Sequence, residues 1–202
     1  MKPNQLVIEA FGPYATRAEV DFDALADTRL FVVSGPTGAG KTSIFDAMCW
    51  ALYGELPGNR LREGKVRSDA ADPGQLTSVS LTFTVDDTVY RVVRQPEQER
   101  PKLRGTGSAT EKQSVELHRR AAGAWEPMAH RWAETNRICA DLVGLTPAQF
   151  QQVVLLPQGR FQEVLHASSD ERTKLLRTLF DTAGFERAQE LLDRRAKTAE
   201  TR

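Results

Sequence analysis

Residues 35–42 combine the residue types and the spacing that bind a phosphate chain. The run Gly35-Pro36-Thr37-Gly38-Ala39-Gly40-Lys41-Thr42 matches the full Walker A pattern, in which a glycine and four further residues precede Gly-Lys-Thr. Glycines let successive backbone amides point inward, and a helix beginning near Lys41 adds the positive end of its dipole. Lys41 is expected to reach the β- and γ-phosphate oxygens, and the Thr42 hydroxyl to coordinate Mg²⁺. The predicted nucleotide contacts are residues 35–42 and the adjacent Ser43.

The segments on either side of this loop have the context that a Walker A loop needs. Leu30-Phe31-Val32-Val33 is a short apolar run stopped by Ser34 and Gly35, which predicts a strand buried on both faces. From Lys41 to Gly54 the apolar residues recur at three- and four-residue spacing, which predicts a helix. The order of strand, loop and helix makes a chance glycine-rich turn a poor explanation of the pattern.

Strands and loops are predicted for most of the chain before residue 131. Short or alternating apolar runs bounded by turn residues predict strands at 5–10, 18–22, 79–85, 89–93 and 114–119. Asp86-Asp87 is expected to turn the chain between two of them, which forms a β-hairpin. Two polar segments are predicted to be irregular, and the second of them to be a mobile loop; they are 54–77 and 96–112.

The pattern becomes helical at about residue 131 and stays so to the end of the chain. Breaks are expected near 144–146, 157–159 and Gly184. Ser168-Ser169-Asp170-Glu171 has the form of a capping box. The last predicted helix resembles an emerging coiled coil, because apolar residues keep a three-four spacing among charges; they are Phe185, Ala188, Leu192, Ala196 and Ala199.

Composition places the chain among globular proteins. Of its 202 residues 40% are hydrophobic, and Lys+Arg and Asp+Glu are balanced at 27 each, so global charge does not decide whether a polyanion binds. Cys49 and Cys139 lie in apolar helical contexts, which predicts buried free thiols in a reducing cytoplasm. No apolar stretch is long enough to cross a bilayer, so we expect a cytoplasmic protein without a membrane partner.

Three ordered blocks resemble one family of ATPases. They are residues 35–42, Asp46-Ala47-Met48-Cys49-Trp50-Ala51-Leu52-Tyr53-Gly54, and Leu155-Leu156-Pro157-Gln158-Gly159-Arg160-Phe161. Together they are similar to the SbcC family, in the SMC-like branch of the ABC ATPases. The resemblance covers essentially the whole chain, including 94–97 and 99–102, which look like an insertion of the bacterial members. It implies an α/β P-loop NTPase of ABC/SMC type: an amino-terminal lobe with a mixed sheet, a β-hairpin insertion and a helical region leading into a coiled coil.

The resemblance also implies a domain division and a second catalytic residue. The head lobe would span 1–165, with the phosphate loop at 35–42, an inserted hairpin region at about 78–120 and a Q-loop at about 155–161; helices at 168–202 would form the root of a coiled coil. Gln158 would be the Q-loop glutamine, which ligates Mg²⁺ and senses the γ-phosphate. It would form the catalytic pair with Lys41, from which it lies 117 positions away. The inserted hairpin explains why this separation is larger than expected of a transporter nucleotide-binding domain.

Two motifs that ABC-type hydrolysis needs are absent from the sequence. There is no apolar strand ending in Asp-Glu and no Ser-Gly-Gly signature; Asp86-Asp87 precedes Gln158 and is interpreted as a turn. In the family both motifs lie in a carboxy-terminal half, beyond a long coiled coil. The resemblance therefore implies an ATPase that needs ATP and Mg²⁺ but is inactive as this chain alone.

The partners implied by the resemblance are proteins and DNA. They are the carboxy-terminal half of the same protein, a second head in an ATP-dependent homodimer, an SbcD-type manganese-dependent nuclease subunit, and double-stranded DNA bound without sequence specificity. ATP binding and hydrolysis would control the action of the nuclease on DNA ends and hairpins. The setting would be the cytoplasm, at the nucleoid, and the helices after Ser168 are the expected docking place for the nuclease.

Basic residues gather between positions 91 and 120, where eight Lys or Arg stand against four Glu. The segment is either a solvated hairpin face or a surface that contacts the DNA backbone, and the candidate contacts are Arg100, Lys102, Arg104 and Lys112. Arg67 is a candidate nucleotide contact because family heads place a loop near the nucleotide there. The family also places an arginine soon after the first strand, where this chain has none, and Arg17 is the possible substitute.

Two other classes of protein share parts of this pattern. A chromosome-organising SMC head would tether DNA without a nuclease, and the segments 157–161 and 100–102 argue against it. A small P-loop kinase or a transporter ATPase is disfavoured by the coiled-coil-like end of the chain. Copurification with a manganese-dependent nuclease, phosphoryl transfer to a small acceptor, or association with a permease would separate these alternatives.

Overall fold

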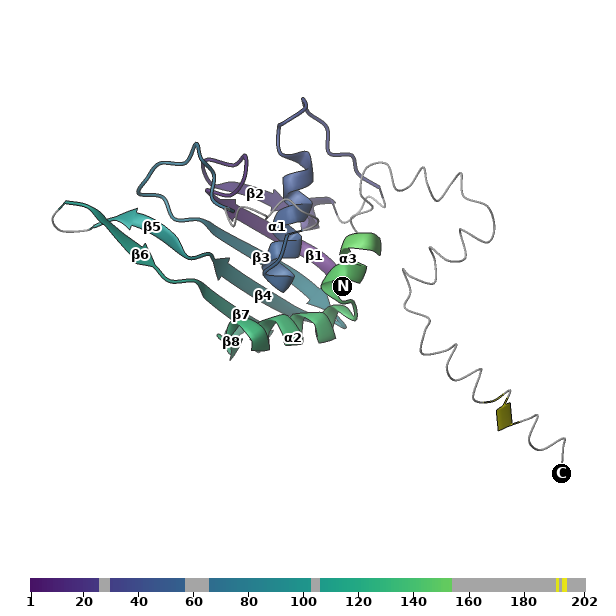
Figure 1. Cartoon of the computed structure of the whole chain (residues 1–202). Helices are drawn as coiled ribbons and strands as arrows, with labels where there is room; N and C mark the ends of the chain where they lie inside the picture. The colour runs from purple at the N-terminus through teal and green to yellow at the C-terminus, as the bar shows by residue number, and fades with distance from the viewer. Residues whose placement is uncertain (26–29, 57–65, 103–105, 154–191, 193, 196–202) are drawn as a thin grey trace. The chain divides into compact units, whose positions relative to one another are not determined.

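The computed structural model describes residues 1–25, 30–56, 66–102, 106–153, 192 and 194–195. The chain divides into two compact units, Met1–Pro147 and Ala148–Arg202, and each is described by itself. The first unit holds the sheet, the phosphate loop and two of the helices (Figure 1). Gln158, Arg104, the predicted capping box at 168–171 and most of the predicted coiled-coil root lie outside the described residues.

A six-stranded sheet in the order β2-β1-β3-β4-β7-β8 forms the framework of the first unit. Its strands are β1 (Lys2–Glu9), β2 (Ala18–Asp21), β3 (Ser78–Val85), β4 (Thr88–Gln95), β7 (Ser114–Ala121) and β8 (Ala124–Ala129). Every pairing between them is antiparallel. The predicted strands at 5–10, 18–22, 79–85, 89–93 and 114–119 are confirmed, as is the α/β class.

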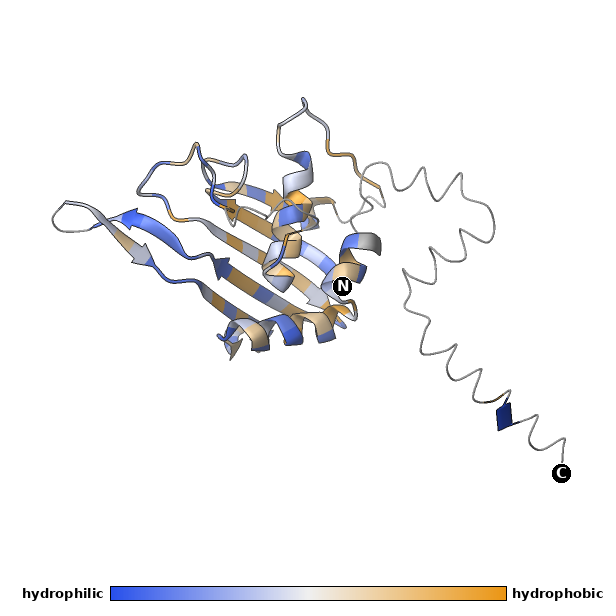
Figure 2. Cartoon of the chain, viewed as in Figure 1, coloured by the Kyte–Doolittle hydropathy of each residue, from blue (hydrophilic) through white to orange (hydrophobic). Residues whose placement is uncertain are grey.

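The period-two pattern of the strands decides which face of the sheet is buried (Figure 2). In β3, Val79, Leu81 and Phe83 are fully buried, and Leu81 lies opposite the buried Val92 of β4. The predicted turn between β3 and β4 is confirmed. Asp86 and Asp87 both have positive φ, at 45° and 63°, as a two-residue hairpin turn requires.

The helices α1 (Lys41–Tyr53) and α2 (Trp132–Val143) pack against the buried face, and α3 (Pro147–Val153) follows them in sequence. α1 contacts β3, β4 and α2, and its residues 46–53 are all buried. Cys49 and Cys139 are both buried and are not joined in a disulfide, as predicted. In the part of the chain that the structure describes, no helix is long and apolar enough to cross a membrane.

The segment predicted to be a mobile loop forms a second, two-stranded sheet instead. β5 (Gln98–Pro101) pairs with β6 (Ser108–Glu111). The prediction was wrong because polar pairs, not apolar residues, join these strands: Arg100 Nε donates to Glu111 Oε2 at 2.9 Å and Thr110 Oγ1 to Glu99 Oε1 at 2.7 Å. β8, which contains a proline and carries no clear alternation, was not predicted at all.

The strand predicted at 30–33 is also not formed, although its apolar residues are there. Leu30 and Val32 are 84% and 82% exposed, and Phe31 and Val33 are exposed as well. A strand needs a neighbour to satisfy its backbone groups, and among the described residues none pairs with this segment. The prediction from the apolar pattern was therefore wrong for this chain as it stands.

Candidate functional site

The phosphate loop lies between the exposed 30–34 segment and α1 (Figure 1). Residues 35–39 are solvent-exposed and Gly40 is buried at the start of the helix. Gly38 has φ +86°, and in the part of the chain that the structure describes nothing lies within 4 Å of the place where a Cβ would stand. The backbone can therefore present its amides to a ligand from a conformation that side chains disfavour.

A turn from the end of β1 supports the loop from one side. A Cβ on Gly40, which has φ +89°, would come within 2.8 Å of Pro13 Cγ and 3.1 Å of the Tyr14 ring. The Tyr14 hydroxyl donates to the Gly40 carbonyl at 3.1 Å, and burial raises the pKa of Tyr14. Only glycine fits at position 40, because both the backbone conformation and the close approach exclude a side chain.

Lys41 and the first turn of α1 provide the positive charge of the site. Lys41 Nζ donates to the carbonyls of Gly35 and Pro36, each at 2.8 Å, so the ammonium is held over the loop. No side chain of the described residues caps the amino terminus of α1, so none of these occupies the amides that a phosphate would use. Thr42 is exposed in the same turn, and Ser43 N donates to the Gly40 carbonyl at 2.9 Å.

These features fit a magnesium–triphosphate group. The loop offers backbone amides, an uncapped helix terminus, an ammonium and a hydroxyl, which are the groups a phosphate chain and its metal require. The structure thus brings together every predicted contact in the run 35–43. The second predicted magnesium ligand, Gln158, lies outside the described residues, and its role stays a prediction.

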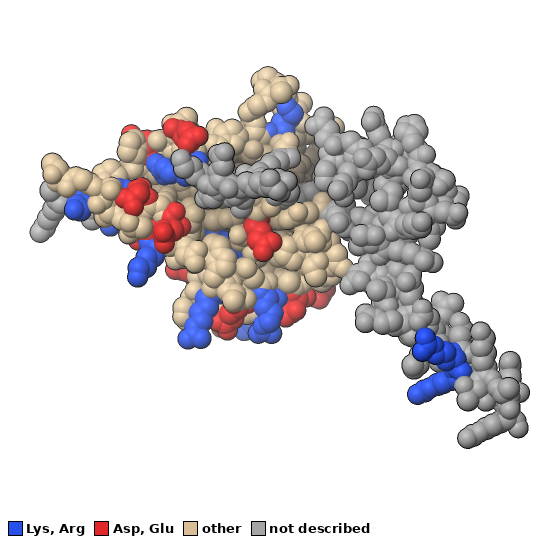
Figure 3. All heavy atoms as spheres, viewed as in Figure 1, with Lys and Arg blue, Asp and Glu red and all other residues tan. Residues whose placement is uncertain are grey.

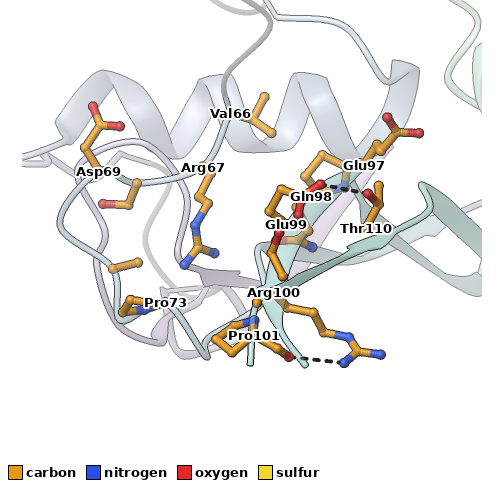
Figure 4. A pocket seen from close by; sticks show the side chains of 15 residues that line it. Val66, Arg67, Asp69, Pro73, Glu97, Gln98, Glu99, Arg100, Pro101 and Thr110 are labelled. Atoms are coloured by element: carbon orange, nitrogen blue, oxygen red, sulfur yellow. Dashed lines mark hydrogen bonds between the residues drawn. The ribbon is translucent and has the colours of Figure 1, made fainter. Parts of the chain in front are cut away.

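Arg67 has partners of its own in the structure. Its backbone bridges to Phe11 beside the Pro13–Tyr14 turn, but its guanidinium donates to the carbonyl oxygens of Asp72, at 2.7 Å, and of Gln75. Arg67 lines one side of a cavity of about 660 Å³, together with the segment up to Pro73, and β5 lines the other (Figure 4). The guanidinium therefore serves the 66–77 loop here, and the proposed nucleotide contact stays a prediction.

The candidate DNA contacts lie on or beside the β5–β6 hairpin, except Arg104, which is outside the described residues. Arg100 is engaged by Glu111, whereas Lys102 and Lys112 are exposed. Acidic and basic side chains alternate on the face seen in Figure 3, so no patch of a single sign stands out there. Arg17, the possible phosphate contact, forms ion pairs with Glu9 and Glu19 at 3.4 and 2.9 Å.

Two residues that support the ends of α1 were missed by sequence reasoning. Tyr14 was given no functional role, and nothing in the sequence signals its contact with Gly40. Arg94 was counted among basic residues of the hairpin region, yet it is fully buried behind α1. The sequence did contain a signal for Arg94. It lies two positions after Val92 and therefore on the same inward face of β4, where the alternating pattern predicts an apolar residue.

The fold and the loop define a P-loop nucleotide-binding domain, and comparison with known proteins agrees. A family model described as AAA domain matches residues 5–201, and the chain belongs to this family.

Among curated relatives, the SbcC subunit of the nuclease SbcCD from Vibrio cholerae serotype O1 is 41% identical over 196 residues, which is 97% of this chain and 19% of that protein. Its counterpart from Staphylococcus aureus strain MRSA252 is 34% identical over 197 residues, covering 98% of this chain and 19% of the relative. The chain thus spans about a fifth of the length of the curated relatives it matches. The resemblance to the SbcC family is confirmed over nearly the whole chain.

Proposed function

We propose that this chain is the ATP-binding part of a split ATPase head that controls a partner nuclease. The observation that carries the proposal is the exposed Walker A loop, with Lys41 held over it by the Gly35 and Pro36 carbonyls and with the uncapped α1 terminus behind it. Residues 35–43 would hold the phosphates of ATP, with Thr42 and Gln158 on Mg²⁺. Lys41 would move from the loop carbonyls to the phosphate oxygens, because a charged acceptor forms the stronger hydrogen bond.

The exposed apolar segment supports the view that the head is completed by another stretch of protein. Leu30, Phe31, Val32 and Val33 stand directly before the phosphate loop with side chains 38–84% exposed. Such a run in water is unfavourable, and an added strand would bury it and pair its backbone groups. We assign that strand to the carboxy-terminal half, which the resemblance expects to carry the Asp-Glu and Ser-Gly-Gly motifs.

Hydrolysis would then depend on groups that arrive from outside this chain. The Asp-Glu pair of the carboxy-terminal half would activate the attacking water, and the signature loop of a second head would cover the γ-phosphate. Two heads would associate while ATP is bound and separate after hydrolysis. This cycle would regulate access of double-stranded DNA ends and hairpins to an SbcD-type nuclease subunit, with Lys102 and Lys112 among the candidate contacts with the DNA backbone.

The first experiment compares steady-state ATPase activity of this chain alone with that of its mixture with the carboxy-terminal half of the same protein. Activity is expected only in the mixture, and Lys41→Ala should abolish it. Lys112→Ala, which removes an exposed lysine away from the phosphate loop, is the matched control and should retain activity without DNA. Robust activity of this chain alone would refute the split-head proposal, because the chain would then contain its own catalytic base.

A rival function is a head that tethers DNA without any nuclease. The relatives named as nuclease subunits favour the nuclease-associated alternative. Affinity purification of the full-length protein followed by a manganese-dependent nuclease assay separates the two. Absence of nuclease activity and of a metallophosphoesterase in the purified complex would favour the tethering function.

A further inference from the structure

Arg94 is a buried cation without a carboxylate partner among the described residues. It is 0% exposed, and burial lowers the pKa of its guanidinium to about 10. Nε donates to the Ala51 carbonyl at 2.6 Å, and Nη2 donates to the Leu52 carbonyl at 3.1 Å and to Asn136 Oδ1 at 2.6 Å. The guanidinium also lies 4.5 Å from the centre of the Trp132 ring. A charge so placed is costly to bury, so its position requires a reason.

The partners of Arg94 identify what it does for α1. The last carbonyls of a helix receive no hydrogen bond from within the helix. α1 also has no basic residue in its own last turn that could donate to them. Gly54 N donates to the Trp50 carbonyl, at 2.7 Å, and Arg94 donates to the next two carbonyls. A cation from β4 therefore completes the carboxyl end of α1 and interacts favourably with the negative end of its dipole.

The same side chain joins three elements at one point. Its backbone belongs to β4, its donors reach the end of α1, and its remaining contacts, Asn136 and Trp132, belong to α2. The other end of α1 is the phosphate loop, about 20 Å away along thirteen residues at about 1.5 Å each. Because a helix behaves as a rod over this length, a change of its carboxyl end also changes where Lys41 and Thr42 stand.

We infer that Arg94 is a positioning residue for the nucleotide site, acting through α1. This inference rests on the proposed function, because it assumes that residues 35–43 bind ATP for hydrolysis. A misplacement of about 1 Å of a group that stabilises a transition state can cost about 100-fold in rate. Arg94 thereby links the phosphate loop to β4, the strand that leads directly into β5.

The test uses Arg94→Met in the full-length protein, since methionine fills the site without the charge. Removing the buried cation favours stability, whereas leaving three acceptors without their donor, the Ala51 and Leu52 carbonyls and Asn136 Oδ1, lowers it. Because the two effects oppose each other, the variant should fold. Arg91→Met is the matched control, because the Arg91 side chain projects from the opposite face of the same strand. Its guanidinium carbon lies 4.5 Å from the centre of the Trp125 ring. Arg94→Lys, which keeps a donor and the charge, should recover part of the activity.

Three measurements are made on each variant: thermal unfolding, the ATPase kcat and KM, and amide hydrogen exchange of peptides covering 35–45 and 46–56. For Arg94→Met we expect a thermal unfolding midpoint close to that of the parent protein. We also expect a kcat at least tenfold lower with a KM changed less than threefold, and faster amide exchange in 35–45 as well as in 46–56. Arg91→Met should leave all of these unchanged.

Each other result has a definite meaning. Unchanged kcat and unchanged exchange in 35–45, with faster exchange in 46–56, would overturn the positioning role and leave Arg94 as a local cap. If Arg94→Met unfolds, the same comparison is made with Arg94→Gln, which keeps a hydrogen-bond donor but not the charge, and wild-type exchange in 35–45 together with wild-type kcat would likewise refute the inference. Absence of Lys41-dependent ATPase in the parent protein would refute the proposed function instead, while hydrogen exchange would still report on Arg94.

Discussion

Gly54→Ala should destabilise the protein far more than Gly144→Ala, although both glycines end helices in the same backbone conformation. Gly54 ends α1 with φ +70° and Gly144 ends α2 with φ +72°, and each donates its N–H to the carbonyl four residues before it. They differ in their surroundings. At Gly144 an added Cβ meets no atom of the described residues within 4 Å, but at Gly54 it would stand 2.7 Å from Cζ2 and Nε1 of Trp132.

The expected magnitudes follow from this difference. A left-handed conformation costs a residue other than glycine about 1–2 kcal/mol. Alanine also makes the unfolded chain less flexible than glycine does, which stabilises the folded state by about 0.4–1 kcal/mol. Gly144→Ala should therefore lower the free energy of unfolding by roughly 1 kcal/mol. At Gly54 the indole must move by about 1 Å to reach an ordinary carbon–carbon separation of about 3.5–4.0 Å. Overpacking of this kind adds about 1–3 kcal/mol, and Trp132 would also lose part of its contact with Arg94. We expect Gly54→Ala to exceed Gly144→Ala by about 2–3 kcal/mol.

Urea unfolding followed by circular dichroism measures both free energies, and equal m-values would show that the comparison is sound. Trp132→Leu provides a second test, because in that background Gly54→Ala should cost only as much as Gly144→Ala. A difference between the two alanine variants below about 0.5 kcal/mol would refute the reasoning. It would mean that the half-buried Trp132 swings aside freely and that Arg94 does not hold it.

Three further predictions concern the phosphate loop, the exposed segment and a buried thiol. Gly40→Ala should lower stability by about 1–3 kcal/mol more than Gly38→Ala in urea unfolding, because overpacking against Pro13 and Tyr14 occurs only at position 40; equal effects would contradict this. Val32→Asp should change the stability of this chain by less than about 0.5 kcal/mol, since the residue is 82% exposed, yet it should prevent association with the carboxy-terminal half in a pull-down; unimpaired association would count against burial of this segment. Burial raises the pKa of Cys139 from 9.0 to about 11, so the contribution of this thiol to stability is complete below pH 9 and is lost as the pH rises toward 11. Cys139→Ala should therefore flatten the decline of the free energy of unfolding above pH 9. An unchanged slope of this free energy against pH would exclude Cys139 as the source of the decline.

Local sequence signals were sufficient where one segment fixes its own structure. The phosphate loop, α1 and the β3–β4 hairpin were predictable because glycines, helical periodicity and two-residue alternation each act within a few positions. Asp86-Asp87 adopts the turn that its position between two alternating runs predicts. The buried state of Cys49 and Cys139 followed in the same way from their apolar helical contexts.

Signals failed where structure depends on distant partners. The β5–β6 hairpin is joined by cross-strand polar pairs, which no hydrophobic pattern reveals. β8 contains Pro127 and forms the edge of the sheet, where a strand tolerates proline. The segment 30–33 has the composition of a buried strand but finds no neighbour among the described residues. The composition of a segment therefore predicts that it needs burial and a neighbouring strand. It cannot predict whether the same chain provides that neighbour.

The two ends of α1 are held by different physical means, and this bears on how the site can respond to a ligand. At the phosphate end, Gly40 is held by the packing of Pro13 and Tyr14 and by one hydroxyl hydrogen bond, next to exposed backbone. At the other end, Arg94 forms three charge-assisted hydrogen bonds out of contact with water. Charge-assisted bonds are roughly twice as strong as neutral ones, so the Arg94 end is the stiffer of the two. Lys41 can therefore exchange loop carbonyls for phosphate oxygens while the far end of the helix keeps its place against β4 and α2.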